Sequence, residues 1–304
     1  MPAAMRETGL DSCRIGLSGG ADSLALTAAA AWASLRRRGP LAGARISARI
    51  VDHGLQPGSD EVARTAGRQA EALGIPAEIV TVTVDPTRVG VEAAARTARY
   101  EALAGPPALL LLAHTLDDQA ETVLLGLARG SGIRSLSGMP PRRGQVLRPF
   151  LAVRRTDTEQ ACRDWGLAWW EDPANGDPAY TRSRLRTAMP ILETTLGPGL
   201  AEALARTADL ARDDADFLDE SAARSGVDPR QRALPLQNLA DLHPALRHRV
   251  LLTWLRTVGQ DAVKRDHVLS VDSLLTDWHG QKGVPVPGGR VQRRGDSLVL
   301  EPFA

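Results

Sequence analysis

Short apolar runs alternate with longer amphipathic stretches over roughly the first 170 residues of the chain. Four of these runs predict β-strands: Cys13–Leu17, Ile46–Val51, Ala77–Val84 and Ala108–Ala113. The second and third are rich in β-branched residues and the last is continuously apolar, as expected for strands covered on both faces. Ala and Leu recur at helical spacing in the stretches that follow each strand, Asp22–Arg37, Asp60–Leu73, Glu92–Leu103 and Asp117–Arg129.

Four strand–helix units in series predict an α/β domain with a parallel sheet and right-handed crossovers. Ligands of such sheets bind in a crevice at the carboxyl ends of the strands. The residues just after Leu17, Val51, Val84 and Ala113 are therefore where we expect a functional site.

The pattern changes after Thr187. A long, acidic, Ala-rich helix is predicted over roughly 200–224, and apolar helical stretches follow around 244–257 and 265–278. Val-rich runs over 283–300, interrupted by Gly and Pro, predict a small terminal hairpin. We therefore expect two domains, residues 1–190 and 191–304, of which the second is smaller and mainly helical.

The composition is that of a globular chain with a substantial core. Of the 304 residues, 43% are hydrophobic and 24% are charged, which excludes a disordered protein. The N-terminal segment has no apolar core of signal-peptide length, and no run of about 18 apolar residues occurs. The sequence thus predicts a cytoplasmic protein with no membrane association. Cys13 and Cys162 form no CxxC pair, so a cysteine-rich zinc or iron–sulfur site is excluded for this chain alone.

The first predicted strand runs into a loop of small and hydroxyl-bearing residues that opens the first helix: Ser18, Gly19, Gly20, Ala21, Asp22 and Ser23. Two glycines let the backbone approach an anion, and a helix N-terminus offers free N–H groups and a positive dipole end. Asp22 suits loop orientation or a magnesium ion on the phosphates. The loop is neither GxxxxGK[ST] nor GxGxxG. It is similar to the phosphate loop of the ATP pyrophosphatase (PP-loop) superfamily; a plain Ser/Gly-rich turn is the alternative.

Two further segments follow strands at the same edge of the predicted sheet. Asp52 and His53 come after the second strand, either as a capping and turn pair or as part of the site. His114 follows the fourth strand and precedes Asp118 and Glu121, which are three residues apart and share a helix face. Like charges this close are unfavourable without a cation among them. The pair therefore indicates a metal or a substrate ammonium, and a solvated acidic first turn is the alternative.

Several motifs in order resemble the tRNA(Ile)-lysidine synthetase family over roughly residues 13 to 190. They are SGGADS, VDHGL, ARTARYEAL, AHTLDDQAETVLLGLARGSG, GMP with RPFL, and DPAN followed by Arg182 to Pro190. The elements HxxDDQxET and RGSG are more discriminating than the phosphate loop, which the whole superfamily shares. Thr115, directly after His114, departs from the pattern and leaves a two-histidine role there without support.

The resemblance implies a PP-loop domain of the adenine nucleotide alpha hydrolase-like fold and an ATP-dependent ligase. In that family, ATP adenylates the C2 oxygen of the wobble cytidine in a CAU anticodon of tRNA(Ile), and the side-chain amine of L-lysine then displaces AMP to form lysidine. Carried over, residues 18–23 with Asp52 and His53 would bind ATP. Asp118 and Glu121 would hold lysine. The catalytic residues would be Asp22, Arg99 and His114, with Asp22 also a ligand of Mg²⁺.

The net charge of +1 argues at first against a nucleic-acid partner, yet it sums two segregated regions. Residues 129–155 contain seven arginines and no acidic residue, whereas 209–220 contain six acidic residues and a single arginine. A basic segment of this kind attracts a phosphate backbone, and an arginine-biased genome is the alternative explanation. The arginines expected to bind tRNA are Arg129, Arg134, Arg142, Arg143, Arg148, Arg182 and Arg184.

Three other functions are weighed against the ligase. A PP-loop tRNA thiolase would deliver sulfur, which the lack of paired cysteines disfavours. A small-molecule amide-forming synthetase has no use for the arginine-rich segment, and a silent nucleotide-sensing or RNA-binding module has no reason to keep Asp118 and Glu121. Trp165, Trp169 and Trp170 are expected to lie mostly in the core, with stacking on an anticodon base as the alternative. A homodimer is compatible with the sequence, which does not specify the oligomeric state.

Overall fold

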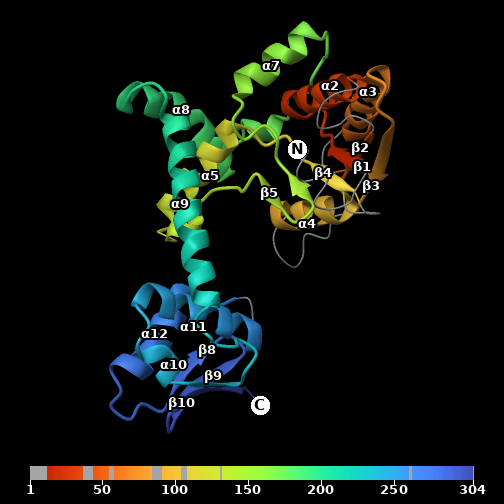
Figure 1. Ribbon diagram of the computed structural model, residues 1–304. Helices are drawn as coiled ribbons and strands as arrows, with labels where there is room; N and C mark the ends of the chain where they lie inside the picture. The colour runs from red at the N-terminus through yellow and green to blue at the C-terminus, as the bar shows by residue number, and fades with distance from the viewer. Residues whose placement is uncertain are drawn as a thin grey trace. The chain divides into compact units, whose positions relative to one another are not determined.

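The structure is a computed structural model that describes residues 12–36, 44–54, 58–83, 91–103, 108–130, 132–259 and 262–303. The chain divides into two compact units, Met1–Arg212 and Asp213–Ala304. Figure 1 labels most of the helices and strands of both. The division falls inside a helix and not near residue 190, where the sequence pattern placed it.

The first unit is built on a six-stranded sheet with the strand order β3-β2-β1-β4-β6-β5. Its strands are β1 (Ser12–Gly16), β2 (Arg45–Asp52), β3 (Ala77–Thr81), β4 (Leu109–Leu111), β5 (Arg142–Arg143) and β6 (Val146–Leu147). All neighbours pair in parallel except β5, which runs antiparallel to β6 at the edge. The predicted parallel sheet is confirmed, while β5 and β6 were not expected. Val84, the predicted end of the third strand, lies outside the described residues.

The helices of this unit are α2 (Ala21–Leu35), α3 (Ser59–Ala72), α4 (Val91–Leu103), α5 (Leu116–Ala128), α6 (Ile133–Leu136), α7 (Arg155–Asp164) and α8 (Thr181–Leu196), with a 3₁₀ turn at Pro173–Asn175. The four predicted helices correspond to α2 through α5. The sequence pattern missed α7 because that helix is strongly polar and buries only Thr158 and Cys162. It missed α8 because Pro190, a residue that normally ends a helix, lies inside it.

Successive side chains of the central strands point to opposite faces of the sheet, and each face is covered by different helices. Ile15 and Leu111 lie in the core formed with α2 and α3, whereas Leu110 packs with Leu103 of α4 on the opposite face (Figure 1). Gly16 also faces α4, where a Cβ atom would lie 3.2 Å from Leu103 Cδ1. The absence of a side chain at this position therefore lets α4 pack close to β1.

Strand β1 lies where the strand order reverses, with β2 and β3 on one side and β4 and β6 on the other. The chain leaves β1 and β4 at the same carboxyl edge of the sheet and turns into α2 and α5 respectively. In open α/β sheets this switch point forms a crevice. The loops after Gly16 and Leu111 therefore meet at one place, as the sequence pattern predicted.

The end of the first unit includes α8 and the first half of α9 (Leu200–Ala223). Met189 of α8 and Ala201 of α9 pack against Leu116 and Ala120 of α5. Further along α9, Arg212 Nη2 donates a 2.7 Å hydrogen bond to a backbone carbonyl just after α6. These contacts carry the first unit past residue 190 and into α9.

The second unit contains a four-stranded antiparallel sheet of order β7-β10-β9-β8. Its elements are β7 (Ala233–Pro235), α10 (Gln237–Ala240), α11 (Pro244–Val258), α12 (Arg265–Thr276), β8 (Val284–Val286), β9 (Gly289–Arg294) and β10 (Ser297–Pro302). The predicted hairpin is β9–β10, enlarged by a strand on each side, and the three predicted helices match α9, α11 and α12. No helix within the described ranges has the length and apolar composition of a membrane span.

A buried ion pair joins α11 to α12. Arg247 Nε lies 2.6 Å from Asp272 Oδ1, and His248 Nε2 lies 3.2 Å from Asp272 Oδ2. Burial alone would raise the pKa of Asp272, but its bonds to Arg247 and His248 more than offset this and lower it. The carboxylate therefore stays ionised inside the second unit.

We expect Asp272→Asn to lower the free energy of unfolding of this unit by about 3 kcal/mol at pH 7, because Arg247 would keep a buried charge without its partner. Since the folded state lowers the pKa of Asp272, its stabilising contribution is present above the ordinary carboxyl pKa of about 4 and is lost as the pH falls through the lowered value. Urea unfolding at pH 7 and pH 3 measures this. Asp214→Asn, at an exposed position, is the control, and a loss at Asp272 that is independent of pH would contradict the assignment.

Candidate active site

Hydroxyl groups organise the loop between β1 and α2. The Ser18 N–H donates to Ser23 Oγ at 3.1 Å, and that hydroxyl donates to the Gly20 carbonyl oxygen at 3.0 Å. Gly19 has a φ of +85°, in the left-handed region that favours glycine. Helix α2 begins after Gly20, which has no side chain and therefore provides no capping hydrogen bond. The first N–H groups of α2 are thus suited to receive an anion.

The segment that follows α7 lies alongside this loop. The Trp170 N–H donates to the Gly19 carbonyl oxygen at 3.0 Å, which fixes the loop from outside. Of the three tryptophans expected mostly in the core, Trp169 packs against it and Trp170 is half-buried. Trp165 differs from that expectation, because 44% of it is exposed.

Thr115 caps helix α5. Its Oγ1 accepts a hydrogen bond from the Asp118 N–H at 3.4 Å, and Asp118 Oδ2 accepts one from the Thr115 N–H at 2.9 Å. This reciprocal pair is a capping box, so the residue after His114 has a local structural role. One carboxylate oxygen of Asp118 serves the cap, and the other, Oδ1, meets a guanidinium group.

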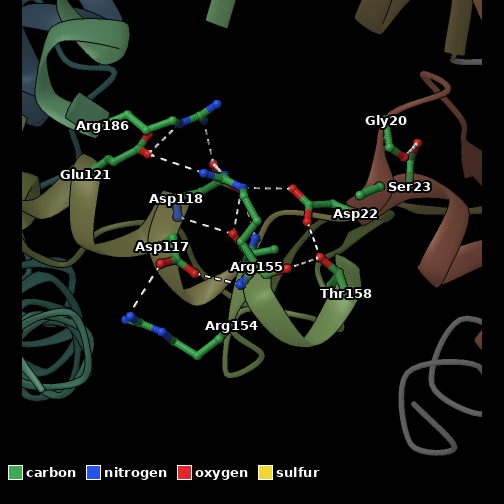
Figure 2. Close-up of polar contacts among 12 residues, drawn as sticks. Gly20, Asp22, Ser23, Asp117, Asp118, Glu121, Arg154, Arg155, Thr158 and Arg186 are labelled. Atoms are coloured by element: carbon green, nitrogen blue, oxygen red, sulfur yellow. Dashed lines mark hydrogen bonds and ion pairs between the residues drawn. The ribbon is translucent and has the colours of Figure 1, made fainter. Parts of the chain in front are cut away.

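Arg155, at the start of α7, lies among three carboxylates (Figure 2). Its Nε is 3.3 Å from Asp22 Oδ2, its Nη2 is 2.7 Å from Asp118 Oδ1, and its Nη1 is 3.7 Å from Glu121 Oε1. Arg186 of α8 approaches the same pair, with its Nε 3.2 Å from Glu121 Oε1 and its Nη2 3.7 Å from Asp118 Oδ1. The negative charges of Asp118 and Glu121 are therefore compensated by arginines of the chain itself.

Burial and charge shift the pKa values of these carboxyl groups in different directions. Burial alone would raise the pKa of Asp118, but Arg155 and the neighbouring donors more than offset it and lower the value. Burial raises the pKa of Glu121, whose side chain is only 3% exposed, and Arg186 offsets that shift in part. Burial also raises the pKa of Asp22. Asp118 is thus the most firmly ionised of the three.

Glu121 and Arg186 also line a hollow of about 180 Å³. Met189 and Pro190 of α8 give it an apolar side, and Glu193 adds a further carboxylate. Asp117, Arg154 and Arg155 complete the lining, so the hollow offers apolar atoms together with three carboxylates and three guanidinium groups.

Asp52 and His53 follow β2. Asp52 Oδ1 accepts hydrogen bonds from the Gly54 N–H at 3.0 Å and from Ser59 Oγ at 2.7 Å, which holds the turn into α3 and lowers the pKa of Asp52. These bonds are those of a capping and turn pair. Burial lowers the pKa of His53, and the charge of Arg99, on α4, lowers it further.

The predicted site residues therefore fall into two groups. Asp22, Asp118 and Glu121 form one cluster through Arg155, and His114 is close enough to Asp118 to help lower its pKa. Arg99 and His53 form the second group, together with the turn built by Asp52. Both groups belong to segments that leave the carboxyl ends of the parallel strands.

Two site residues of α7 escaped the sequence analysis. Arg155 was counted only as part of a basic segment, and its backbone N–H donates to Asp117 Oδ2 at 2.7 Å. The Thr158 hydroxyl donates to Asp22 Oδ1. These contacts join positions far apart in the chain, so no local spacing signals them. The capping box at Thr115 and Asp118, in contrast, follows the Thr-x-x-Asp pattern and was recognisable.

The acid-free arginine segment divides between surface and interior. Arg142 is half-buried on the edge strand β5. Arg148 was expected to bind tRNA, but the structure does not place it on the surface. Only 8% of the residue is exposed, and its Nη1 donates to the Pro140 carbonyl oxygen at 2.9 Å. Arg154 and Arg155 pair with carboxylates. The exposed members of the expected set are Arg129, Arg134, Arg143, Arg182 and Arg184.

Asp22 is the candidate ligand for Mg²⁺. Its Oδ2 faces Arg155 and its Oδ1 accepts the Thr158 hydroxyl. Within the part of the chain that the structure describes, no group of three or more His, Cys, Asp or Glu side chains is arranged to hold a metal alone. One carboxylate beside a phosphate-binding loop nevertheless fits Mg²⁺, which takes one or two protein carboxylates and completes its shell with phosphate oxygens and water.

A parallel sheet with a Ser/Gly loop at its switch point, and with carboxylates on the helix that follows the neighbouring strand, defines an ATP-binding domain of the PP-loop class. Residues 3–192 match the PP-loop domain family, and residues 234–299 match the TilS substrate-binding domain family.

Similar sequences show which family of PP-loop proteins the chain belongs to. The chain is 51% identical to the tRNA(Ile)-lysidine synthase of Leifsonia xyli, over 95% of this chain and 89% of that protein. It is 50% identical to the tRNA(Ile)-lysidine synthase of Mycobacterium tuberculosis, over 95% and 89%, and 48% identical to that of Thermobifida fusca, over 94% and 90%. The chain belongs to the tRNA(Ile)-lysidine synthase family of ATP-dependent ligases.

Among solved structures, a U34-tRNA thiolase from Methanococcus maripaludis with its [4Fe-4S] cluster has a similar fold. The TM-score is 0.51 at 19% sequence identity, and the match covers 66% of this chain and 72% of the thiolase. At this identity the likeness concerns the fold alone. It confirms the α/β architecture of the first unit.

We expect Gly19→Ala to destabilise the phosphate loop by about 1–2 kcal/mol, because an L side chain is strained at positive φ and its Cβ would lie 3.1 Å from Val62 Cγ1. ATP affinity, measured by calorimetry, should fall with it. Gly20→Ala is the matched control, since Gly20 has a φ of −78° and its Cβ would have 3.7 Å to the nearest atom. Unchanged stability of Gly19→Ala would refute the argument.

Proposed function

We propose that this protein ligates L-lysine to C2 of the wobble cytidine in the CAU anticodon of tRNA(Ile), with ATP as co-substrate, and releases AMP and pyrophosphate. The observation that carries the proposal is the adjacency of the phosphate loop and the Asp118–Glu121 pair, which Arg155 joins in one cluster. Membership of the tRNA(Ile)-lysidine synthase family supports the same reaction.

The reaction has two steps. The C2 oxygen of cytidine attacks the α-phosphorus of ATP, the bond from that phosphorus to the bridging oxygen breaks, and pyrophosphate leaves. The lysine side-chain nitrogen then bonds to C2, the bond between C2 and its oxygen breaks, and AMP leaves with that oxygen while the amine gives up a proton. Both steps need positioning and charge compensation more than covalent help from the protein.

The phosphate loop, Arg99 and His114 serve the first step. The N–H groups at the start of α2 and the hydroxyl groups of Ser18 and Ser23 suit phosphate oxygens. Mg²⁺ held by Asp22 would offset charge on the leaving pyrophosphate. Arg99 and His114 would stabilise the transferred phosphoryl group beside the cytidine.

Asp118 and Glu121 serve the second step by holding the lysine ammonium. Three carboxylates, those of Asp22, Asp118 and Glu121, face the guanidinium groups of Arg155 and Arg186, so the cluster accepts a further cation. The apolar side of the adjoining hollow would take the lysine stem. Glu121, whose pKa is raised by burial, suits the proton that the amine must lose before it attacks.

A sulfur-transfer reaction has less support. Cys13 and Cys162 are both buried, and burial raises the pKa of each thiol to about 11, whereas sulfur chemistry proceeds through a thiolate. Two buried free thiols also fit the reducing cytoplasm in which we place the protein.

The exposed arginines of the first unit would bind tRNA through its phosphate backbone. Arg143 lies on edge strand β5, and Arg129 and Arg134 flank the turn between α5 and α6. Contacts of this kind are independent of base sequence and weaken with salt. The second unit, which matches a substrate-binding domain family, would make the remaining contacts with tRNA(Ile).

Incubation with ATP, radiolabelled lysine and single purified tRNA species tests the function directly. We expect label in tRNA(Ile) with a CAU anticodon and none in tRNA(Met), which has the same anticodon. Labelled lysine in no tRNA at all would overturn the proposal.

In the same assay, Asp118→Asn should raise the KM for lysine about 10- to 100-fold, because it removes a charge-assisted hydrogen bond of about 1.5–3 kcal/mol, and leave ATP binding intact. The amide oxygen can still accept the Thr115 N–H, so the cap survives. Thr115→Val is the converse control: it should cost about 1 kcal/mol of stability with Asp118 still charged. An unchanged KM for lysine in Asp118→Asn would remove this residue from the amine site.

Charge reversal of Arg142 and Arg143 should weaken tRNA binding and flatten its salt dependence. Each lost phosphate contact lowers the slope of log K against log salt by roughly 0.7 to 0.9. Filter binding at several salt concentrations measures this. Arg36→Glu, at the exposed end of α2 far from the carboxyl edge of the sheet, is the control. An unchanged slope would place both arginines outside the interface.

A further inference from the structure

The guanidinium group of Arg155 meets a different carboxylate with each of its nitrogens (Figure 2). Nε faces Asp22, which belongs to the phosphate loop and lies in the first turn of α2, whereas Nη2 and Nη1 face Asp118 and Glu121 on α5. The side chains of Arg155, Asp22 and Asp118 are 21%, 24% and 21% exposed. At this depth the charges are less screened by solvent than surface charges are, and removal of one partner is costly because it leaves the other charge uncompensated.

The backbone that carries this guanidinium group is held in place independently. The Arg155 N–H donates to Asp117 Oδ2 at 2.7 Å, and the Leu116 N–H donates to the Val153 carbonyl oxygen at 2.9 Å. Further along α7, Cys162 Sγ donates to the Ala21 carbonyl oxygen at 3.3 Å. Helix α7 is thus bonded to the first turns of both α5 and α2.

Other basic side chains of the cluster make narrower contacts. Arg186 approaches Asp118 and Glu121, and Arg154 approaches Asp117, Glu193 and Glu202. Among the described residues, Arg155 is the side chain that forms ion pairs both with Asp22 and with carboxylates of α5. This side chain is therefore the direct ionic link between the phosphate loop and the amine-binding pair.

We propose that Arg155 is a positioning residue that keeps the phosphate loop and the amine-binding carboxylates in register, so that the lysine nitrogen is aimed at C2 of the adenylated cytidine. This inference rests on the proposed function. Misplacement of reacting groups by about 1 Å costs on the order of 100-fold in rate. The guanidinium group thus acts as a fork, which means that its three nitrogens contact three different carboxylates. Arg155→Lys would keep the positive charge but lose this fork, because an ammonium group is a compact point charge.

The effect falls on the second step more than on the first. Without the fork, Asp22 keeps its bond from Thr158 and the phosphate loop keeps its own hydroxyl bonds, so adenylation can proceed. Asp118 and Glu121 lose their tie to that loop, and attack by lysine slows. Adenylated tRNA then accumulates before lysidine forms.

Single-turnover reactions with ATP labelled at the α-phosphate, lysine that carries a second label, and tRNA(Ile) test this, with the full chain as wild type, Arg155→Lys and Arg155→Gln. We expect lysidine formation to slow about 100-fold in Arg155→Lys, with AMP-labelled tRNA accumulating that the wild type does not accumulate. Arg163→Gln, on the exposed side of the same helix, should leave both steps unchanged. Arg155→Gln shows whether loss of the charge adds to loss of the fork.

Parallel loss of both steps in the Arg155 variants without labelled tRNA, or wild-type rates in Arg155→Lys, would overturn the inference. The same accumulation in Arg163→Gln would also overturn it, since a general effect on α7 would then explain the result. Failure of the wild type to label tRNA with either AMP or lysine would instead overturn the proposed function. The two failures are therefore distinguishable in one experiment.

Discussion

The pairing of buried carboxylates with guanidinium groups is the interaction around which the first unit is arranged. Asp118 and Glu121 lie on one face of α5, where an uncompensated charge would be costly. Arg155 and Arg186 neutralise them from α7 and α8, so three helices are held by the same few atoms. The phosphate loop depends on this set as well, because Arg155 also reaches Asp22.

The same arrangement explains how a site for a cation remains folded without its ligand. A bare pair of acids on one helix face repels itself, and the first turn of α5 would be strained by it. Internal arginines relieve that repulsion, and the Thr115 cap holds one oxygen of Asp118. If lysine binds here, as the proposed function requires, it enters a cluster whose geometry already exists, which lowers the ordering cost of binding.

Local patterns in the sequence were sufficient for most of the first unit. Strands such as Cys13–Leu17 and the loop after it follow from periodicity and from residue types that act over a few positions. Long-range contacts were not predictable: Arg155 was counted only as one arginine of an acid-free segment, yet it faces acids from α2 and α5. Helix α8 was missed for a related reason, since packing on α5 overrides Pro190.

The two cysteines have a use beyond the argument against sulfur transfer. Cys13 lies in β1 just before the phosphate loop, and Cys162 bonds to the backbone at the first turn of α2. Both thiols are buried. The rate at which Cys162 is alkylated is therefore a native chemical reporter of local opening at the first turn of α2, and motion at the nucleotide site can be followed without introducing any label into the chain.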